Sequence, residues 1–182
     1  MTEFNQLQTI KRYFFAMRNG IIADTLRKAG SPYKIIFGLN LPQLTEYAEQ
    51  LGFDAELSRT LWNNRSTRES MLLAPMIFPV AEMDFDEAKR WICESPYPET
   101  TDILCHKLIR KLPFAWDLAE QLIKSPNDLQ RYAAIRIFWN LVSTHASRIK
   151  PLICNEAESG NVMTSNLAQR LMEEIDYLTN ED

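Results

Sequence analysis

Apolar residues recur along this chain in paired blocks, and the pairs themselves repeat. Within each block the apolar positions are three or four residues apart, which is the spacing of one face of an α-helix. Leu61-Trp62, Trp91-Ile92 and Leu122-Ile123 fall 30 and 31 residues apart, and each is followed by a polar loop and a second apolar helix. Helix pairs at this period are typical of a stacked helical solenoid, in which neighbouring units bury each other's faces. A non-repetitive helical bundle is the alternative, because the units share little sequence.

Glycines and capping residues divide the chain into the expected helices. The pattern predicts one helix over Phe4–Met17 and another over Ile21–Ala29, then a long connection over residues 31–41 and a helix from Pro42 to Gly52. The residues expected to open later helices are Asp54, Ser66 or Thr67, Asp84 or Asp86, and Thr164 or Ser165. No alternating strand pattern of useful length occurs. The sequence therefore predicts an all-α protein with a single domain over residues 1–182 and an acidic C-terminal helix over 164–179.

Composition excludes several classes of protein. The 182 residues are 46% hydrophobic and 24% charged, which is typical of one soluble globular core. No apolar run approaches the roughly 20 residues needed to span a bilayer, and the N-terminus lacks a secretion signal, so we expect no membrane partner and a cytoplasmic location. The three cysteines, Cys93, Cys105 and Cys154, lack the paired spacing of a zinc site. We expect no metal and no cofactor.

The net charge of −4 is unevenly distributed along the sequence. Residues 103–151 carry eight Lys/Arg against three Asp/Glu, whereas residues 152–182 carry one against seven. A local positive field attracts phosphates even when the total charge is negative. The candidate phosphate contacts in this basic segment are Lys107, Arg110, Lys111 and Arg136. A mixed, solvated surface is the commoner explanation of such charge counts.

The same segment contains an aromatic ring, a carboxylate and a guanidinium. Trp116 and Glu120 are four residues apart, so on a helix they share one face, and Arg131 opens the next amphipathic helix. A ring beside an anion suits a ligand that is flat and positively charged. The same pair is also common in ordinary helix packing.

With these features in order, the chain resembles the DNA alkylation repair family, the AlkD-type DNA glycosylases built from HEAT-like helix pairs. The resemblance covers about residues 10–142. It rests on the segment Gly30–Gly38 before a proline-initiated helix, on Leu61-Trp62 with Glu69, and on Trp116-Asp117 with Arg131-Tyr-Ala-Ala-Ile135. It implies a right-handed α-α superhelix of HEAT-like helix pairs.

The resemblance also implies a function and roles for individual residues. Family members excise alkylated, often cationic, bases from DNA, so the implied partner is damaged double-stranded DNA and the implied reaction is N-glycosidic bond hydrolysis. Trp116 would stand beside the lesion, Glu120 would replace the family's catalytic aspartate, and Arg131 would contact the backbone. Tyr33 matches an aromatic residue on the lesion side.

Three departures keep a second hypothesis open. Position 120 is Glu rather than Asp, no tryptophan follows Trp139 to supply the family's later aromatic residue, and residues 152–182 are acidic. One extra methylene displaces a carboxylate, and an ångström of misplacement costs on the order of 100-fold in rate. The alternative is a non-catalytic HEAT-like module that binds the DNA backbone or a protein partner.

Overall fold

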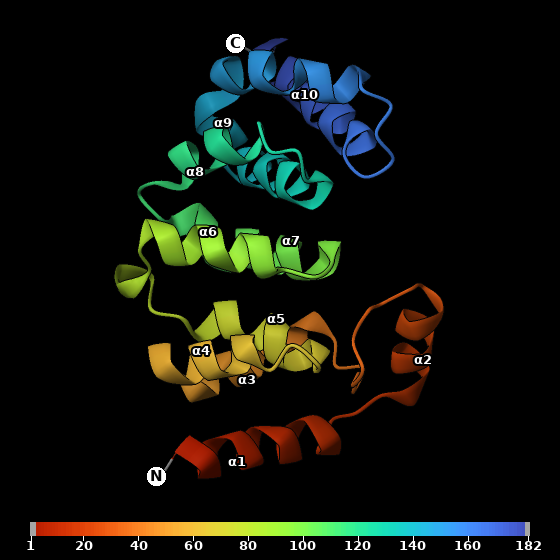
Figure 1. Ribbon diagram of the computed structural model, residues 1–182, viewed down its shortest axis with the longest axis vertical. Coiled ribbons are helices and arrows are strands. Elements are labelled where there is room, and N and C mark those ends of the chain that lie inside the picture. Colours follow the sequence, from red (N-terminus) through yellow and green to blue (C-terminus); the bar gives the residue numbers. More distant parts are fainter. Residues whose placement is uncertain (1–2, 181–182) are drawn as a thin grey trace. The chain divides into compact units, whose positions relative to one another are not determined.

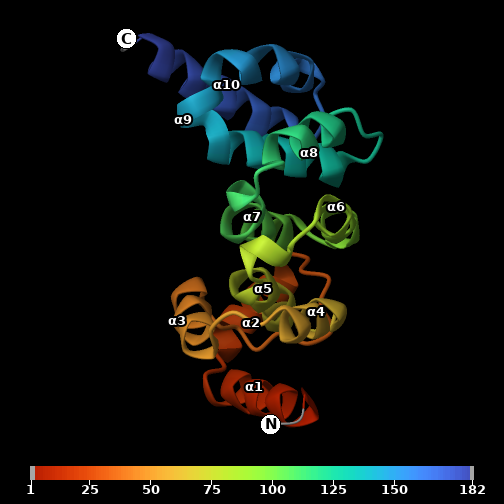
Figure 2. The same ribbon diagram turned by 90° about the vertical axis from the view of Figure 1, so that its left-hand side faces the viewer.

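The computed structural model describes residues 3–180, and these fold into helices joined by short connections (Figures 1 and 2). The chain divides into two compact units, Met1–Glu82 and Met83–Asp182. The all-α class predicted from the sequence is confirmed, since the only β-type pairing in the described residues is an isolated bridge between Ile35 and Thr67. The single 1–182 domain stays a prediction.

The first unit contains five α-helices and a short 3₁₀ helix within the described residues. They are α1 (Glu3–Ala16), α2 (Gly20–Lys28), α3 (Leu41–Leu51), α4 (Ala55–Asn63), α5 (Arg68–Ile77) and η1 (Val80–Glu82). Helix α5 packs against both α3 and α4, and it lies between them in Figure 2. Its position explains why nearly all of its residues are buried, including the polar Arg68, Glu69 and Ser70.

Short polar side chains cap three of these helices. Asp54 was expected from the sequence, Asn19 and Asn40 were not, and the expected Thr67 precedes α5 without a capping hydrogen bond from its side chain. Asn19 accepts hydrogen bonds from the amides of Ile21 and Ile22, and Asp54 accepts one from Leu57 N. Asn40 and Gln43 form a reciprocal capping box at the start of α3. These side chains satisfy amides that have no partner inside the helix. All three caps are therefore local features, in which the side chain and its target amide lie within four consecutive residues.

The connection before α3 is held by a buried carboxylate. Glu69 of α5 is fully buried, and its two oxygens accept hydrogen bonds from Phe37 N at 3.0 Å and Gly38 N at 2.9 Å. Arg68 completes this arrangement by donating to Glu69 Oε1 at 2.9 Å and to the carbonyl of Leu39 at 3.0 Å. An ion pair without solvent needs such additional partners to offset its desolvation. Residues 36–39 are thus fixed without being part of a helix or strand.

The second unit contains five more α-helices and one 3₁₀ helix within the described residues. They are α6 (Phe85–Glu94), α7 (Pro98–Lys107), η2 (Ile109–Lys111), α8 (Ala115–Leu122), α9 (Asp128–Glu158) and α10 (Ser165–Asn180). Helix α9 packs against α6, α7, α8 and α10, and Figure 1 shows it beside α8 and α10. Its apolar side chains, among them Ile135, Phe138 and Ile149, form the centre of the unit's core.

Helix α9 is much longer than the periodicity indicates. The apolar pattern identifies Ala133–Leu141, whereas the helix runs for 31 residues with a break at His145, whose backbone has φ −135° and ψ 16°. Pro151 lies inside the helix and has no amide to donate to the carbonyl four residues earlier. The break and the proline interrupt the regular spacing of apolar residues, which is why the second half of the helix is missed from the sequence.

None of the helices in residues 3–180 combines the length and the apolar character that a bilayer span requires.

Candidate nucleic-acid interface

Trp116 lies in the first turn of α8, and its indole is covered by side chains from α9. The ring centroid is 5.3 Å from that of Phe138 and 5.0 Å from that of His145, whose ring is stacked on it at 23°. The guanidinium carbon of Arg148 lies 4.2 Å from the indole centroid, in a cation–π contact. Indole Nε1 is buried and has no hydrogen-bond partner in the described structure. The ring that we expect beside a cationic lesion therefore already contacts a cation of the same unit.

Glu120 follows Trp116 by one turn of α8 and is partly exposed. Its carboxylate has no hydrogen bond or ion pair with another described residue, in contrast to most carboxylates on α9. A carboxylate without an internal partner keeps all its lone pairs for a ligand. Trp116 and Glu120 thus lie one turn apart on α8, as the sequence spacing predicts, and both are partly exposed.

Arg131 is held by three contacts within its own unit. It donates to Glu156 Oε2 at 3.0 Å, to the carbonyl of Ser125 at 2.9 Å and to Asp128 Oδ1 at 2.6 Å, and its side chain is 17% exposed. Glu156 also accepts a hydrogen bond from the hydroxyl of Thr164. These contacts join the first turn of α9 to the connection before α10, so the guanidinium that the resemblance assigns to the DNA backbone has a structural role here.

Arg136 is also paired, one turn and a half further along α9. Its Nε donates to Asp102 Oδ1 of α7 at 2.6 Å, and Tyr132 donates its hydroxyl to the same oxygen at 2.9 Å. Burial raises the pKa of Asp102, although the charge of Arg136 and the hydrogen bonds from Tyr132 and Arg136 oppose that rise. Burial likewise raises the pKa of the Tyr132 phenol, with the Asp102 charge adding to it. The group ties α7 to α9.

Lys107, Arg110 and Lys111 form a basic cluster at the end of α7 and in η2. Desolvation and then the charges of Arg110 and Lys107 lower the pKa of Lys111, so the three cations are close enough to repel one another. Arg110 and Lys111 are exposed and Lys107 is half-buried. We call these three residues the η2 cluster. Among the basic residues proposed from the sequence, Arg110 and Lys111 are exposed, whereas Arg131 and Arg136 are held in ion pairs.

Tyr33 belongs to the first unit and is 5% exposed. Its ring is part of the core beside the connection that Glu69 holds. The roles assigned from the sequence to Glu120, Trp116, Arg131, Tyr33 and the basic residues stay predictions, while their surroundings are now known. In the described residues, no group of three or more His, Cys, Asp or Glu is arranged to hold a metal ion.

Sequence reasoning missed the two residues that contact the Trp116 ring. The spacing of apolar residues identified neither His145 nor Arg148 as a neighbour of Trp116. They meet the indole only because α9 continues through its break at His145. The basic charge of residues 103–151 was the one available indication that Arg148 lay near this site.

A family model described as DNA alkylation repair enzyme matches residues 10–174, and so includes the rest of α9 and part of α10 as well as the 10–142 segment expected. A solved structure described as "A new family of proteins related to the HEAT-like repeat DNA glycosylases with affinity for branched DNA structures" has a TM-score of 0.79 to this chain. The two are 15% identical, and the alignment covers 90% of this chain and 73% of that one. No curated protein is significantly similar. The likeness confirms the predicted HEAT-like helical fold.

Proposed function

The chain belongs to the DNA alkylation repair enzyme family, and from that premise we propose that it binds the DNA phosphate backbone through the η2 cluster. The observation that carries the proposal is the presence of three cations within five residues at the end of α7 and in η2, two of them exposed. Desolvation first, and then the charges of Arg110 and Lys107, lower the pKa of Lys111. A phosphate bound there relieves that repulsion. The free energy gained includes the release of counterions from DNA, so the affinity depends steeply on salt.

The structural neighbour supports DNA as the ligand. It is related to HEAT-like repeat DNA glycosylases and has affinity for branched DNA structures. Backbone phosphates are common to duplex and branched DNA, and contacts to them carry no sequence information. We therefore infer binding that is independent of sequence and includes both kinds of DNA, with the protein acting in the cytoplasm as the sequence predicts.

The test is the salt dependence of DNA binding by fluorescence anisotropy. Each phosphate neutralised by a cation contributes about −0.9 to the slope of log K against log salt for duplex DNA. The triple variant Lys107→Gln/Arg110→Gln/Lys111→Gln should lose about 2 to 3 from the magnitude of that slope. The matched control removes three exposed cations elsewhere, Lys28→Gln/Lys124→Gln/Arg170→Gln. An equal change in both triple variants would refute a role for the η2 cluster.

Glu120 favours excision of alkylated bases as a second candidate function. Its carboxylate is partly exposed, has no internal partner in the described structure, and lies one turn from an indole whose face already attracts a cation. When the bond from C1′ to an alkylated base breaks, the electron pair leaves with the base and the sugar becomes positive. A fixed carboxylate stabilises that charge, and water then adds to C1′ and loses a proton. A cationic base at Trp116 would take the place of Arg148.

Base release distinguishes this candidate from binding alone. The protein is incubated with duplex DNA containing N7-methylguanine, and the free base is measured for wild type, Glu120→Gln and the control Asp117→Asn. Asp117 is an exposed carboxylate on the same helix. Release that is lost only in Glu120→Gln supports excision. Absence of release with intact salt-dependent binding leaves the backbone-binding function and rejects the enzyme.

A further inference from the structure

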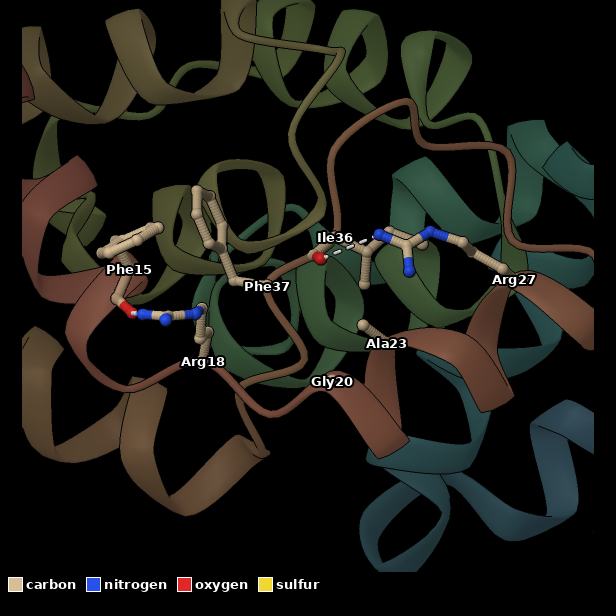
Figure 3. A pocket seen from close by; sticks show the side chains of 7 residues that line it. All are labelled: Phe15, Arg18, Gly20, Ala23, Arg27, Ile36 and Phe37. Atoms are coloured by element: carbon tan, nitrogen blue, oxygen red, sulfur yellow. Dashed lines mark hydrogen bonds between the residues drawn. The ribbon is translucent and has the colours of Figure 1, made fainter.

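A pocket in the first unit combines two guanidinium groups with an apolar lining. It has a volume of about 280 Å³ and lies between the end of α1, the helix α2 and the segment that Glu69 holds (Figure 3). The lining residues are Phe15, Arg18, Gly20, Ala23, Arg27, Ile36 and Phe37. Nothing in the proposed backbone contact at η2 involves this pocket.

The two arginines are oriented by backbone carbonyls at separate places on the pocket wall (Figure 3). Arg18 donates to the carbonyl of Phe15 at 2.7 Å, and Arg27 donates to the carbonyl of Ile36 at 3.3 Å and to Asp24 at 2.8 Å. Arg18 has no carboxylate partner among the described residues. A guanidinium has five N–H donors, so each arginine keeps donors for an anion. The pocket therefore has an incompletely neutralised positive charge in fixed positions.

The aromatic and apolar residues give the pocket a second chemical character. Phe15 is 58% exposed, and the guanidinium carbon of Arg18 lies over its ring, 3.9 Å from the ring centroid. Ala23, Ile36 and Phe37 form an apolar lining beside it. An inorganic anion gains nothing from such a surface. A ligand with a flat apolar face and an attached anionic group gains from both parts.

We propose that this pocket binds one unpaired nucleotide of a DNA strand, with the phosphates on its two sides at Arg18 and Arg27 and its base against Phe15 and Phe37. The volume is near the lower end of the pockets that hold small ligands, about 300 Å³, and suits one nucleotide rather than a base pair. A paired base has both faces stacked on its neighbours, so only an unpaired base can stack on an aromatic side chain.

Charge along the sequence favours a nucleic acid over a peptide as the occupant. The first 40 residues contain six Lys/Arg and two Asp/Glu, so the pocket belongs to a strongly positive part of the chain. A polyanion with a phosphate at every unit is attracted to the whole of this segment, whereas a short acidic peptide is attracted only where its few charges lie. This inference rests on the proposed function, because it assumes that DNA is the ligand.

The experiment compares a duplex containing one bulged thymidine with the same duplex fully paired, by anisotropy at fixed salt. Wild-type protein should prefer the bulged DNA by about tenfold, which is the contribution of one stacked base. Phe15→Ala and Arg18→Gln should each reduce the preference by about three- to tenfold. The matched controls, Phe53→Ala and Arg12→Gln, change an exposed phenylalanine and an exposed arginine of the same unit outside the pocket, and they should keep the preference.

The outcomes separate this inference from the proposed function. Binding of paired DNA without any preference for the bulge overturns the pocket inference alone, as does an equal loss in the control variants. Binding of neither DNA overturns both proposals. An acidic peptide is the other occupant to test. If it binds wild type but not Arg18→Gln, and does not compete with bulged DNA, the pocket is a peptide site and the nucleotide proposal is refuted. Circular dichroism of each variant checks that the helices are intact.

Discussion

Gly38 is the position where adding a single methyl group should damage the first unit most. Its φ is +84°, and a Cβ built there would lie 2.2 Å from the carbonyl oxygen of Asn19 and 2.9 Å from the amide nitrogen of Ala23. Both are backbone atoms that cannot rotate away. Asn19 N also donates to the carbonyl of Phe37 at 2.8 Å, and Ala23 N donates to Asn19 O at 3.0 Å. Relief of the clash therefore requires α2 and the Gly38 segment to separate.

The expected cost of Gly38→Ala has two parts. The left-handed backbone conformation costs a residue with a Cβ about 1–2 kcal/mol. A separation of an ångström weakens the hydrogen bond from Asn19 N to the Phe37 carbonyl and displaces Gly38 N from the buried Glu69 carboxylate. A buried group left without its partner costs about 1–3 kcal/mol. We expect a total loss of about 3–5 kcal/mol in the free energy of unfolding.

Gly30 provides the matched control. Its φ is +87°, nearly the same as that of Gly38, but a Cβ there meets no atom within 4 Å. Gly30→Ala should cost only the conformational part, about 1–2 kcal/mol. Urea unfolding followed by far-UV circular dichroism measures both variants. Equal destabilisation by the two substitutions would show that the close approach of α2 contributes nothing.

Three further predictions concern buried charges. Glu69→Gln should destabilise the protein by about 3–5 kcal/mol in urea unfolding, because it leaves the Arg68 guanidinium buried without its anion; a change below 1 kcal/mol would contradict this. Arg131→Gln should cost about 1–3 kcal/mol by unpairing the nearly buried Glu156, and it should leave the salt slope of DNA binding unchanged; a smaller slope would show that Arg131 contacts phosphate after all. The pKa of Asp102 is higher in the folded protein than its ordinary value of 3.8, so protonation of this carboxyl stabilises the folded state. That stabilisation is complete below pH 3.8 and is lost as the pH rises through the folded-state pKa. The difference in Tm between wild type and Asp102→Asn should therefore change with pH between those two pKa values and be constant at higher pH.

The helix starts could be predicted from the sequence because capping is local. Asp54 and Asp84 accept hydrogen bonds from amides three residues away, so the cap and its target are in one short segment. The repeat of helix pairs could be predicted for a similar reason, since each apolar face has its own period. Neither inference requires knowing which distant residues meet.

The surroundings of the candidate site depend on distant residues and could not be predicted. Arg131 looks like a free cation at the start of a helix until Glu156, 25 residues later, is placed against it. Trp116 looks like an open aromatic surface until the break in α9 brings His145 and Arg148 onto it. Glu120 is partly exposed, and its carboxylate forms no hydrogen bond or ion pair with another described residue. The spacing on one helix predicted which residues are neighbours. Only the tertiary structure showed which of them already contact side chains that are distant in the sequence.

The buried carboxylate of Glu69 gives residues 36–39 an unusual dynamic property. The amides of Phe37 and Gly38 are outside any helix, yet each donates to an oxygen that is itself sealed from water. Exchange of these two protons with deuterated solvent requires α5 to open, and so their rates should be those of a helix interior rather than those of a turn. By this measure, the segment that lines the pocket is among the slowest-opening parts of its unit.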